Sequence, residues 1–343
     1  MGKQNTTVHE VAKRTGVSIA TVSRVVRGVG QVSPETRQRV QEAIAELGYR
    51  PSRFGRALVE RRHSALGIVF PGLAGPYYSE VIQGFEAEAV TARQSVLIFG
   101  THLLEQSEDQ VLDMASRVDG MAIMGGTLSN ECVQTLIDQE VPIVLLARHP
   151  MPNVPTVRVE NTQSTRDITL HLLTTHGYDP IYFIGNPTGS PDTTDRWEGF
   201  VAAHRQVGRE PGALIRVGFQ QADGVWAISQ ILEAGELPRA IVCANDEIAL
   251  GVHAALTARG VRIPEQVALT GWDDIPMARL IAPALSTVCQ PTRELGSQTA
   301  KLLLARIKGE LDEPPDVVLP TEVIIRQSCG CTHEAATNGQ RSF

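Results

Sequence analysis

The 343-residue sequence has no apolar run that approaches the ~18–20 residues a membrane-spanning helix needs. Its first residues, MGKQNTT, lack the apolar core of a secretory signal. Cysteines are few and odd in number, which disfavours a disulfide framework and favours reduced thiols. The five are Cys132, Cys243, Cys289, Cys329 and Cys331. These absences predict a cytoplasmic protein with no membrane partner.

Several site signatures are also missing. Cys329 and Cys331 form a C-x-C near the end of the chain, but no second cysteine pair or histidine cluster completes a metal site. His171 and His176 are five positions apart, which predicts different faces of a helix. G-x-S-x-G, P-loop and H-E-x-x-H motifs are absent. We therefore expect no metal site, no cofactor, no catalytic residues and no enzymatic activity.

The charge distribution is uneven along the chain. Residues 1–62 hold twelve Lys/Arg and five Asp/Glu, a net charge of +7. The remaining residues hold 19 basic and 33 acidic side chains, a net charge of −14, so the overall value of −7 conceals a basic head on an acidic body. A compact basic segment of this kind is the electrostatic pattern of a small nucleic-acid-binding module.

The head has the punctuation of three short helices. TVHE at residues 7–10 is a capping box, and Gly16 ends the first helix. Ser18 caps the second helix, and Ser33 with Pro34 begins the third. Two short helices joined by a glycine turn are typical of a helix-turn-helix. A three-helix bundle without a partner is the alternative on this pattern alone.

The head and the rest of the chain resemble the LacI/GalR (lactose-repressor) family of bacterial transcription regulators. The resemblance begins with TVHEVA at residues 7–12 and GVSIATVSRV at residues 16–25. It continues through LGYRPS at residues 47–52 and Ala57-Leu58, then extends to Arg326. The family implies a ligand-controlled regulator that binds DNA as a dimer.

The resemblance implies a set of DNA-binding residues. Arg24 suits the O6 and N7 atoms of guanine in the major groove, and Ile19 suits a thymine methyl group. Leu58 would be a wedge in the minor groove, on a hinge that is helical only on DNA. Hydroxyl side chains suit phosphate oxygens, which set register. The full set is Thr7, Ser18, Ile19, Ala20, Thr21, Ser23, Arg24, Ser52, Arg53 and Leu58.

The body alternates short apolar runs with amphipathic stretches, which predicts doubly wound α/β architecture with parallel strands. The expected strands are 65–70, 96–99, 120–124, 142–146, 181–185, 240–244 and 267–271. Helices are expected at residues 78–92 and 247–259. The resemblance implies a two-lobed, periplasmic-binding-protein-like effector domain.

These observations predict four parts of the chain: a helix-turn-helix head at 1–50, a hinge and linker at 51–63, an effector-binding and dimerisation domain at 64–331, and a disordered tail at 332–343. The lobes would comprise about 64–160 with 290–320, and 162–289 with 321–331.

Ligands of such bodies lie between the lobes, at the carboxyl ends of strands. The resemblance assigns ligand contact to Arg196, Asn245 and Asp273, whose donors and acceptors suit a polyhydroxy ligand. Asp246 is expected to cap the helix that follows it. The effector-binding residues predicted here are Tyr77, Arg148, Arg196, Phe219, Asn245, Asp273 and Gln290.

Two departures from the family bear on the ligand. Ala147-Arg148 stands where many sugar-responsive members carry Asp-Arg, which leaves the exact sugar open. Ser190 stands where purine-responsive members carry arginine, which favours a sugar, a sugar phosphate or a related compound over a purine.

The function predicted from the sequence is therefore a repressor that binds a pseudopalindromic operator as a dimer and responds to a small molecule. A sugar-binding transport receptor is the first alternative, and the basic head and the missing export signal argue against it. A sugar-processing enzyme is the second, and no nucleophile or acid–base pair supports it. The operator, the effector and the sign of the response stay open.

Overall fold

A computed structural model describes residues 6–49, 63–104 and 106–332, with the backbone alone of Arg27. The chain forms two compact units, Met1–Ser64 and Ala65–Phe343. The expected hinge residues Ser52, Arg53 and Leu58 and nearly all of the expected tail lie outside the described residues. None of the helices among the described residues has the length and hydropathy to span a bilayer.

Residues 6–49 of the first unit form three helices, α1 (Val8–Thr15), α2 (Ile19–Arg27) and α3 (Pro34–Leu47). The amide of Thr7 donates to the Glu10 carboxylate at 2.6 Å, as the capping box predicts. All three helices end at a glycine in the left-handed conformation. Their inward faces share a small core of Val11, Ala12, Val22, Val25, Val40 and Ala43. Because Val22 and Val25 are buried in this core, the opposite side of α2 faces outward.

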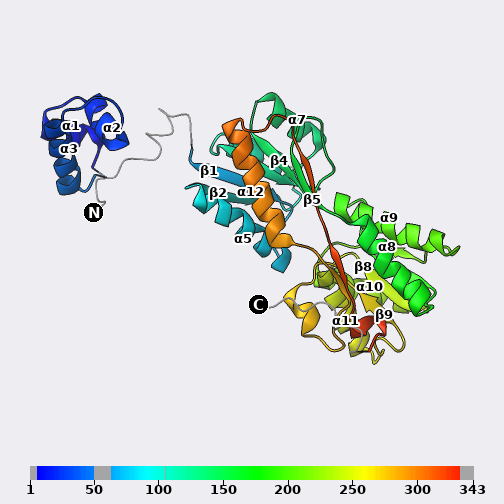
Figure 1. Cartoon of the computed structure of the whole chain (residues 1–343). Helices are drawn as coiled ribbons and strands as arrows, with labels where there is room; N and C mark the ends of the chain where they lie inside the picture. The colour runs from blue at the N-terminus through cyan, green and yellow to red at the C-terminus, as the bar shows by residue number, and fades with distance from the viewer. Residues whose placement is uncertain (1–5, 50–62, 105, 333–343) are drawn as a thin grey trace. The chain divides into compact units, whose positions relative to one another are not determined.

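The second unit begins with a six-stranded parallel sheet, which forms the first lobe (Figure 1). Its strand order is β11-β5-β4-β3-β1-β2. The strands are β1 (Ala65–Phe70), β2 (Ser95–Gly100), β3 (Gly120–Met124), β4 (Ile143–Leu146), β5 (Thr156–Val159) and β11 (Asp316–Leu319). Helices α5 (Pro76–Thr91) and α12 (Thr292–Lys308) pack on one face. Helices α6 (Ser107–Ala115) and α7 (Asn130–Asp138) pack on the other.

A four-stranded parallel sheet of order β7-β6-β8-β9 forms the second lobe. Its strands are β6 (Ile181–Ile184), β7 (Leu214–Ile215), β8 (Ala240–Cys243) and β9 (Ala268–Thr270). The helices of this lobe are α8 (Thr162–Leu170), α9 (Pro191–Gln206), α10 (Gln221–Ala234) and α11 (Asp246–Ala258). The last turn of α8 continues as a π-helix, η1 (His171–Thr175), and a 3-10 turn, η2 (Pro276–Arg279), follows β9.

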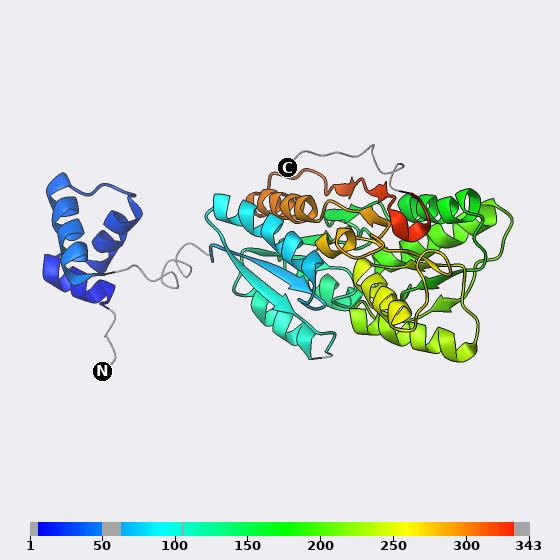
Figure 2. The ribbon, with the colours of Figure 1, turned by 90° about the horizontal axis from the view of Figure 1, so that it is seen from below.

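The lobes are joined by several passages of the chain, visible from two directions in Figures 1 and 2. One runs from β5 to α8, and the second runs from β10 (Thr287–Cys289) to α12. The third runs from β11 to β12 (Glu322–Ile324), which pairs antiparallel with β10. The chain then turns through η3 (Gln327–Cys329) against the second lobe. The predicted fold class, a small helical head and a two-lobed doubly wound body, is confirmed.

Candidate functional sites

The first site is the outer face of α2 in the head. Ser18 caps α2 by accepting from the Thr21 amide at 3.2 Å, and the two hydroxyls lie 2.9 Å apart. Because the core takes Val22 and Val25, the residues between them turn outward. The face therefore carries hydroxyl, apolar and cationic groups together.

The side chains on this face of α2 differ in how exposed they are to solvent. Ile19 is 41% exposed, which leaves an aliphatic group available for contact on this face. Thr7, Ser18, Ala20 and Arg24 are exposed as well, whereas Thr21 and Ser23 are half-buried. The stem of Arg24 lies beside Gly30, where an added Cβ would stand 3.2 Å from the Arg24 Cδ atom. The aliphatic part of the Arg24 side chain thus packs beside Gly30. Its guanidinium forms no salt bridge with another residue that the structure describes.

The second site is a cavity of about 710 Å³ in the body. It is lined from the first lobe by the segments after β1, β2, β3 and β4, and from the second lobe by those after β6, β7, β8 and β9. This is the position at which open parallel sheets bind ligands, because loops from neighbouring strands converge there. The volume lies within the usual range for small-molecule sites, about 300–1,000 Å³.

Arg196 is the cation of the cavity, and it is held rigidly. Its Nε donates to the Asn161 side chain at 2.8 Å, and its Nη1 donates to the carbonyl of Ala244 at 2.7 Å. The guanidinium carbon lies 4.3 Å from the Trp272 ring centroid, a cation–π contact. These contacts come from three separate segments, so they fix where the remaining N–H groups point.

Asp273 supplies a carboxylate on the same cavity. Its backbone φ is 119°, an unfavourable angle for a side-chain-bearing residue, and its amide donates to the Val288 carbonyl at 2.8 Å. The side-chain amide of Gln290 donates to its Oδ1. Loss of solvent around the carboxyl raises the pKa of Asp273 to about 7, against the lowering effects of Arg196 and Gln290.

Aromatic side chains form an apolar wall. Tyr77, Tyr78 and Phe219 all line the cavity, and the two tyrosine rings meet edge to face with centroids 5.3 Å apart. Within the described part of the chain, the buried Tyr77 hydroxyl and the Gln290 Oε1 have no hydrogen-bond partner. Burial and the nearby Asp192 and Asp273 raise the pKa of Tyr77, so its hydroxyl stays protonated. Unpaired buried polar atoms in a cavity are the expected partners of a polar ligand.

One capping assignment was wrong. We expected Asp246 to cap the helix after β8, but α11 begins one residue earlier and its cap is Asn245, whose Oδ1 accepts from the Ile248 amide at 2.9 Å. Asp246 is buried and accepts instead from the Thr287 hydroxyl and the Ile275 amide. Asn245 still lines the cavity, and its Nδ2 donates to the Phe219 carbonyl at 3.1 Å.

Arg148, by contrast, does not line the cavity as expected. Ala147 has a φ of 49°, a left-handed turn. The Arg148 side chain is buried beneath the β3–α7 loop, where its Nη1 donates to the Leu128 carbonyl at 3.1 Å and its Nη2 donates to Asn130. Ala147 itself lines the cavity, so this part of the lining is apolar.

Three acidic lining residues were missed from the sequence: Asp192, Asp223 and Glu247. Asp192 lies four residues before Arg196 on α9 and 3.8 Å from its guanidinium. All three occupy the first turn of a helix that follows a strand, where acidic residues are ordinarily interpreted as helix-dipole partners. The signal that could have found them is their place at the carboxyl end of a predicted parallel strand.

A helix-turn-helix head and a two-lobed body, with a largely apolar cavity that carries a few polar groups at the strand ends, define the class of ligand-regulated DNA-binding proteins. Residues 7–52 match the family described as "Bacterial regulatory proteins, lacI family", and residues 170–329 match "Periplasmic binding protein-like domain".

Full-length relatives agree with these domain matches. The chain is 31% identical over 330 residues to the HTH-type transcriptional regulator RegA of Clostridium saccharobutylicum, which covers 94% of this chain and 99% of the relative. A solved complex of the transcriptional regulator CelR with cellobiose is 30% identical, with a TM-score of 0.72 over 94% of this chain and 100% of that one. A Lac repressor dimer bound to operator and the anti-inducer ONPF is 26% identical, with a TM-score of 0.81 over 95% of this chain and 99% of that one. The chain belongs to the lacI family, as its motifs predict, and is a DNA-binding transcription regulator.

Proposed function

We propose that this regulator is a cytoplasmic, non-enzymatic repressor that binds a pseudopalindromic operator as a dimer and is controlled by a sugar in the body cavity. The observation that carries the proposal is the pairing of Arg196 and Asp273 on one cavity beside an aromatic wall. Two solved relatives support it, since one is a repressor dimer bound to an operator and another is a regulator in complex with cellobiose.

In this proposal the exposed face of α2 reads the operator. Arg24 donates to a guanine and Ile19 packs on a thymine methyl. The hydroxyls of Thr7, Ser18, Thr21 and Ser23 contact phosphates, while Ala20 permits close approach to a base edge. The hinge residues Ser52, Arg53 and Leu58 complete the interface in the minor groove, with Leu58 as the wedge.

The cavity suits a polyhydroxy ring. The Asp273 carboxylate accepts from ligand hydroxyls, while Arg196 and one free N–H of the Asn245 amide donate to ligand oxygens. Tyr77 and Phe219 cover the apolar ring face. Gln290 is 4% exposed and bonded to Asp273, so it holds the carboxylate while offering its unpaired Oε1 to the ligand.

The charge balance of the cavity favours a neutral sugar over a sugar phosphate. The described lining carries four carboxyl groups, Asp192, Asp223, Glu247 and Asp273, against one guanidinium, that of Arg196. An added phosphate brings further negative charge into this acidic surround, which costs free energy at short distance. A ligand with hydroxyls alone avoids this cost.

The proposed function is tested by titrating a panel of effectors against the full chain on DNA recovered by selection from random duplexes. We expect the selected DNA to be pseudopalindromic and its affinity to fall steeply with salt, because each half-site recruits residues 1–62, whose net charge is +7. We expect neutral mono- or disaccharides, rather than their phosphates or nucleobases, to change that affinity. A response to nucleobases alone, or selected DNA without two-fold symmetry, would contradict the proposal.

The affinity for a neutral sugar should depend on pH through Asp273. Its pKa is about 7, and the groups facing it are Arg196, Gln290, Asp192, Glu247 and the buried Asp246. Loss of the proton makes both oxygens of the carboxyl acceptors and adds a charge that strengthens their hydrogen bonds to ligand hydroxyls, so affinity should rise with pH. Between pH 6 and pH 8 the gain should be about tenfold by calorimetry on the DNA-free chain. A flat profile, equal to that of Asp273→Asn, would show that the ionised carboxylate does not bind the sugar.

A further inference from the structure

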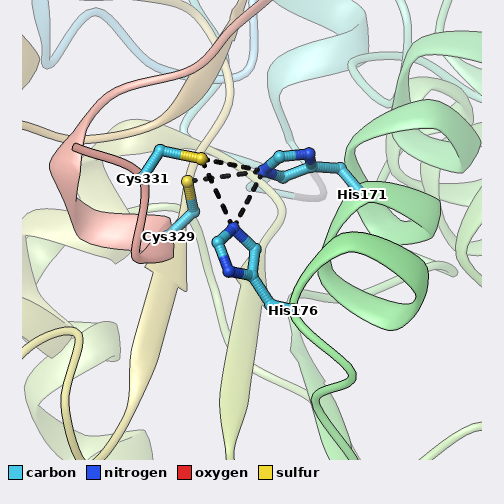
Figure 3. Close-up of side chains that lie close together, drawn as sticks. All are labelled: His171, His176, Cys329 and Cys331. Atoms are coloured by element: carbon cyan, nitrogen blue, oxygen red, sulfur yellow. Dashed lines mark hydrogen bonds between the residues drawn. The ribbon is translucent and has the colours of Figure 1, made fainter. Parts of the chain in front are cut away.

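Four side chains with metal-ligating atoms converge on one point in the second lobe, outside the effector cavity (Figure 3). The Nε2 atoms of His171 and His176 lie 3.2 Å apart. The Cys331 Sγ lies 3.4 Å from each of them, and the Cys329 Sγ lies 3.6 Å from the His171 Nε2. All four ligand atoms lie within 4.8 Å of one another. The prediction that the two histidines face apart and that no histidines accompany the C-x-C was therefore wrong.

The local backbone explains why the histidines meet. In an α-helix, residues five apart point in different directions, but residues 171–175 form a π-helix, whose hydrogen bonds join residues five apart. His171 and His176 are thus brought onto one face, with ring centroids 4.8 Å apart. Single π turns inside α-helices occur frequently at functional sites.

The C-x-C segment is shaped to meet them. Cys329 ends the 3-10 turn η3, and Gly330 follows with a φ of 103°, a conformation that L side chains rarely adopt. A Cβ at Gly330 would lie 2.5 Å from the Tyr178 Oη and 3.3 Å from the His176 ring. Tyr178 in turn stacks on His176 at a centroid distance of 5.0 Å. Glycine therefore lets both thiols turn toward the imidazoles at close range.

Four of the six separations between these atoms are close to those of a tetrahedral zinc site, and all six lie within 4.8 Å, so small side-chain rotations would complete it. Bonds of about 2.3 Å to sulfur and about 2.0–2.1 Å to nitrogen place tetrahedral ligands about 3.3–3.8 Å apart. The His171–His176, Cys331–His171, Cys331–His176 and Cys329–His171 separations run from 3.2 to 3.6 Å. Both imidazoles present Nε2, a nitrogen that ligates zinc. The H-x₄-H spacing also falls within the range found in structural zinc sites.

We propose that His171, His176, Cys329 and Cys331 bind one Zn²⁺ in a closed structural site. Four protein ligands leave no open position for water or substrate, which makes the site structural rather than catalytic. Each thiol releases its proton to solvent on binding, and the imidazoles bind as neutral rings. The Cys329 thiol, now 3.2 Å from the Arg326 carbonyl, exchanges that hydrogen bond for the metal bond.

The site joins two segments far apart in the sequence. The ion would link the C-terminal end of α8 and η1, in the helix that follows the first passage between the lobes, to the η3 segment. That segment follows the third passage between the lobes. Between β12 and η3, Arg326 pairs with Asp274 at 2.6 Å, and Asp274 adjoins Asp273 of the effector cavity. The zinc would thereby fix the segment that carries Arg326, and through the Arg326–Asp274 ion pair the loop that holds Asp273.

The test uses tag-free full-length protein, purified with a non-chelating reductant from zinc-supplemented cells. We expect about one zinc per chain by elemental analysis. Replacement by Co²⁺ should give intense tetrahedral ligand-field bands and a thiolate-to-cobalt charge-transfer band. Cys331→Ser and His176→Gln should each lower bound zinc about tenfold after dialysis against a weak chelator.

Matched substitutions outside the cluster serve as controls. Cys289→Ser and His253→Gln make the same chemical changes elsewhere in the body and should retain the zinc. The cobalt spectrum is measured on the wild-type protein, so it tests the site even if a variant fails to fold. Wild-type protein without zinc and without a thiolate–cobalt band would reduce the cluster to thiol–imidazole hydrogen bonds and overturn the proposal. Zinc retained by the Cys331→Ser/His176→Gln double variant, or stoichiometric iron or copper in its place, would also overturn it.

Discussion

Asp273→Asn should bind the operator normally and fail to respond to the effector. The amide removes one hydroxyl acceptor and the negative charge, and the unpaired ligand hydroxyls cost ~1–3 kcal/mol, about 5- to 150-fold in effector affinity. At effector concentrations that just suffice for the wild type, a repressor with this change stays bound if the effector is an inducer, and stays released if the effector is a corepressor. The measurement is operator affinity at a concentration of effector that saturates the wild type.

The substitution should not unfold the body. Asp273 raises the pKa of the buried Asp246, and Asp192 and Glu247 raise the pKa of Asp273, so these carboxyls repel one another when ionised. A carboxyl whose folded pKa is raised destabilises the fold increasingly as pH rises through that pKa. Asp273→Asn should therefore melt no lower than the wild type at pH 8. Asp312→Asn, the same change at an exposed position, is the matched control and should keep a full response. A full response in Asp273→Asn would remove this carboxyl from the effector site.

Arg24→Ala should weaken binding to the specific operator much more than binding to random DNA. A bidentate contact with guanine is worth ~1–3 kcal/mol, so binding to the selected operator should fall about 5- to 150-fold per half-site. Preference at one base pair in each half-site should be lost, while binding to random duplex changes little. Repeating the random-duplex selection with the variant measures this directly.

Arg39→Ala is the control for charge. Arg39 lies exposed on α3, and its replacement removes one positive charge from the same head. It should weaken specific and random DNA binding by similar factors, because unspecific attraction depends on charge. Equal losses on specific and random DNA for Arg24→Ala as well would assign Arg24 to phosphate alone.

The elements that the sequence predicted well have strong periodicity. β1 and β3 match their predicted bounds, and α5 and α11 lie within two residues of theirs, because six apolar residues or four helical turns leave little ambiguity. Short strands were missed: β7 has two residues, and β11 pairs with β5 across more than 150 residues of sequence. No local pattern records such pairing.

The site residues show the same difference between features that local sequence predicts and features that it does not. Asp273 and Arg196 were predicted from the family resemblance, at the end of a strand and in the first turns of a helix, and the structure places both on the cavity. Arg148 was misplaced because one left-handed residue, Ala147, redirects the next side chain. The histidine pair was missed because a π turn changes the helical period, and nothing in HLLTTH announces a π turn.

The central claim, that a ligand in the cavity controls operator binding, is tested most directly by thermodynamic linkage on the wild-type chain. Operator affinity is measured with and without saturating effector, and effector affinity is measured with and without saturating operator. Both affinities should change in the same direction and by the same factor, about 5- to 150-fold, because coupling between two binding sites is reciprocal. An effector that binds the chain but leaves operator affinity unchanged would contradict the account.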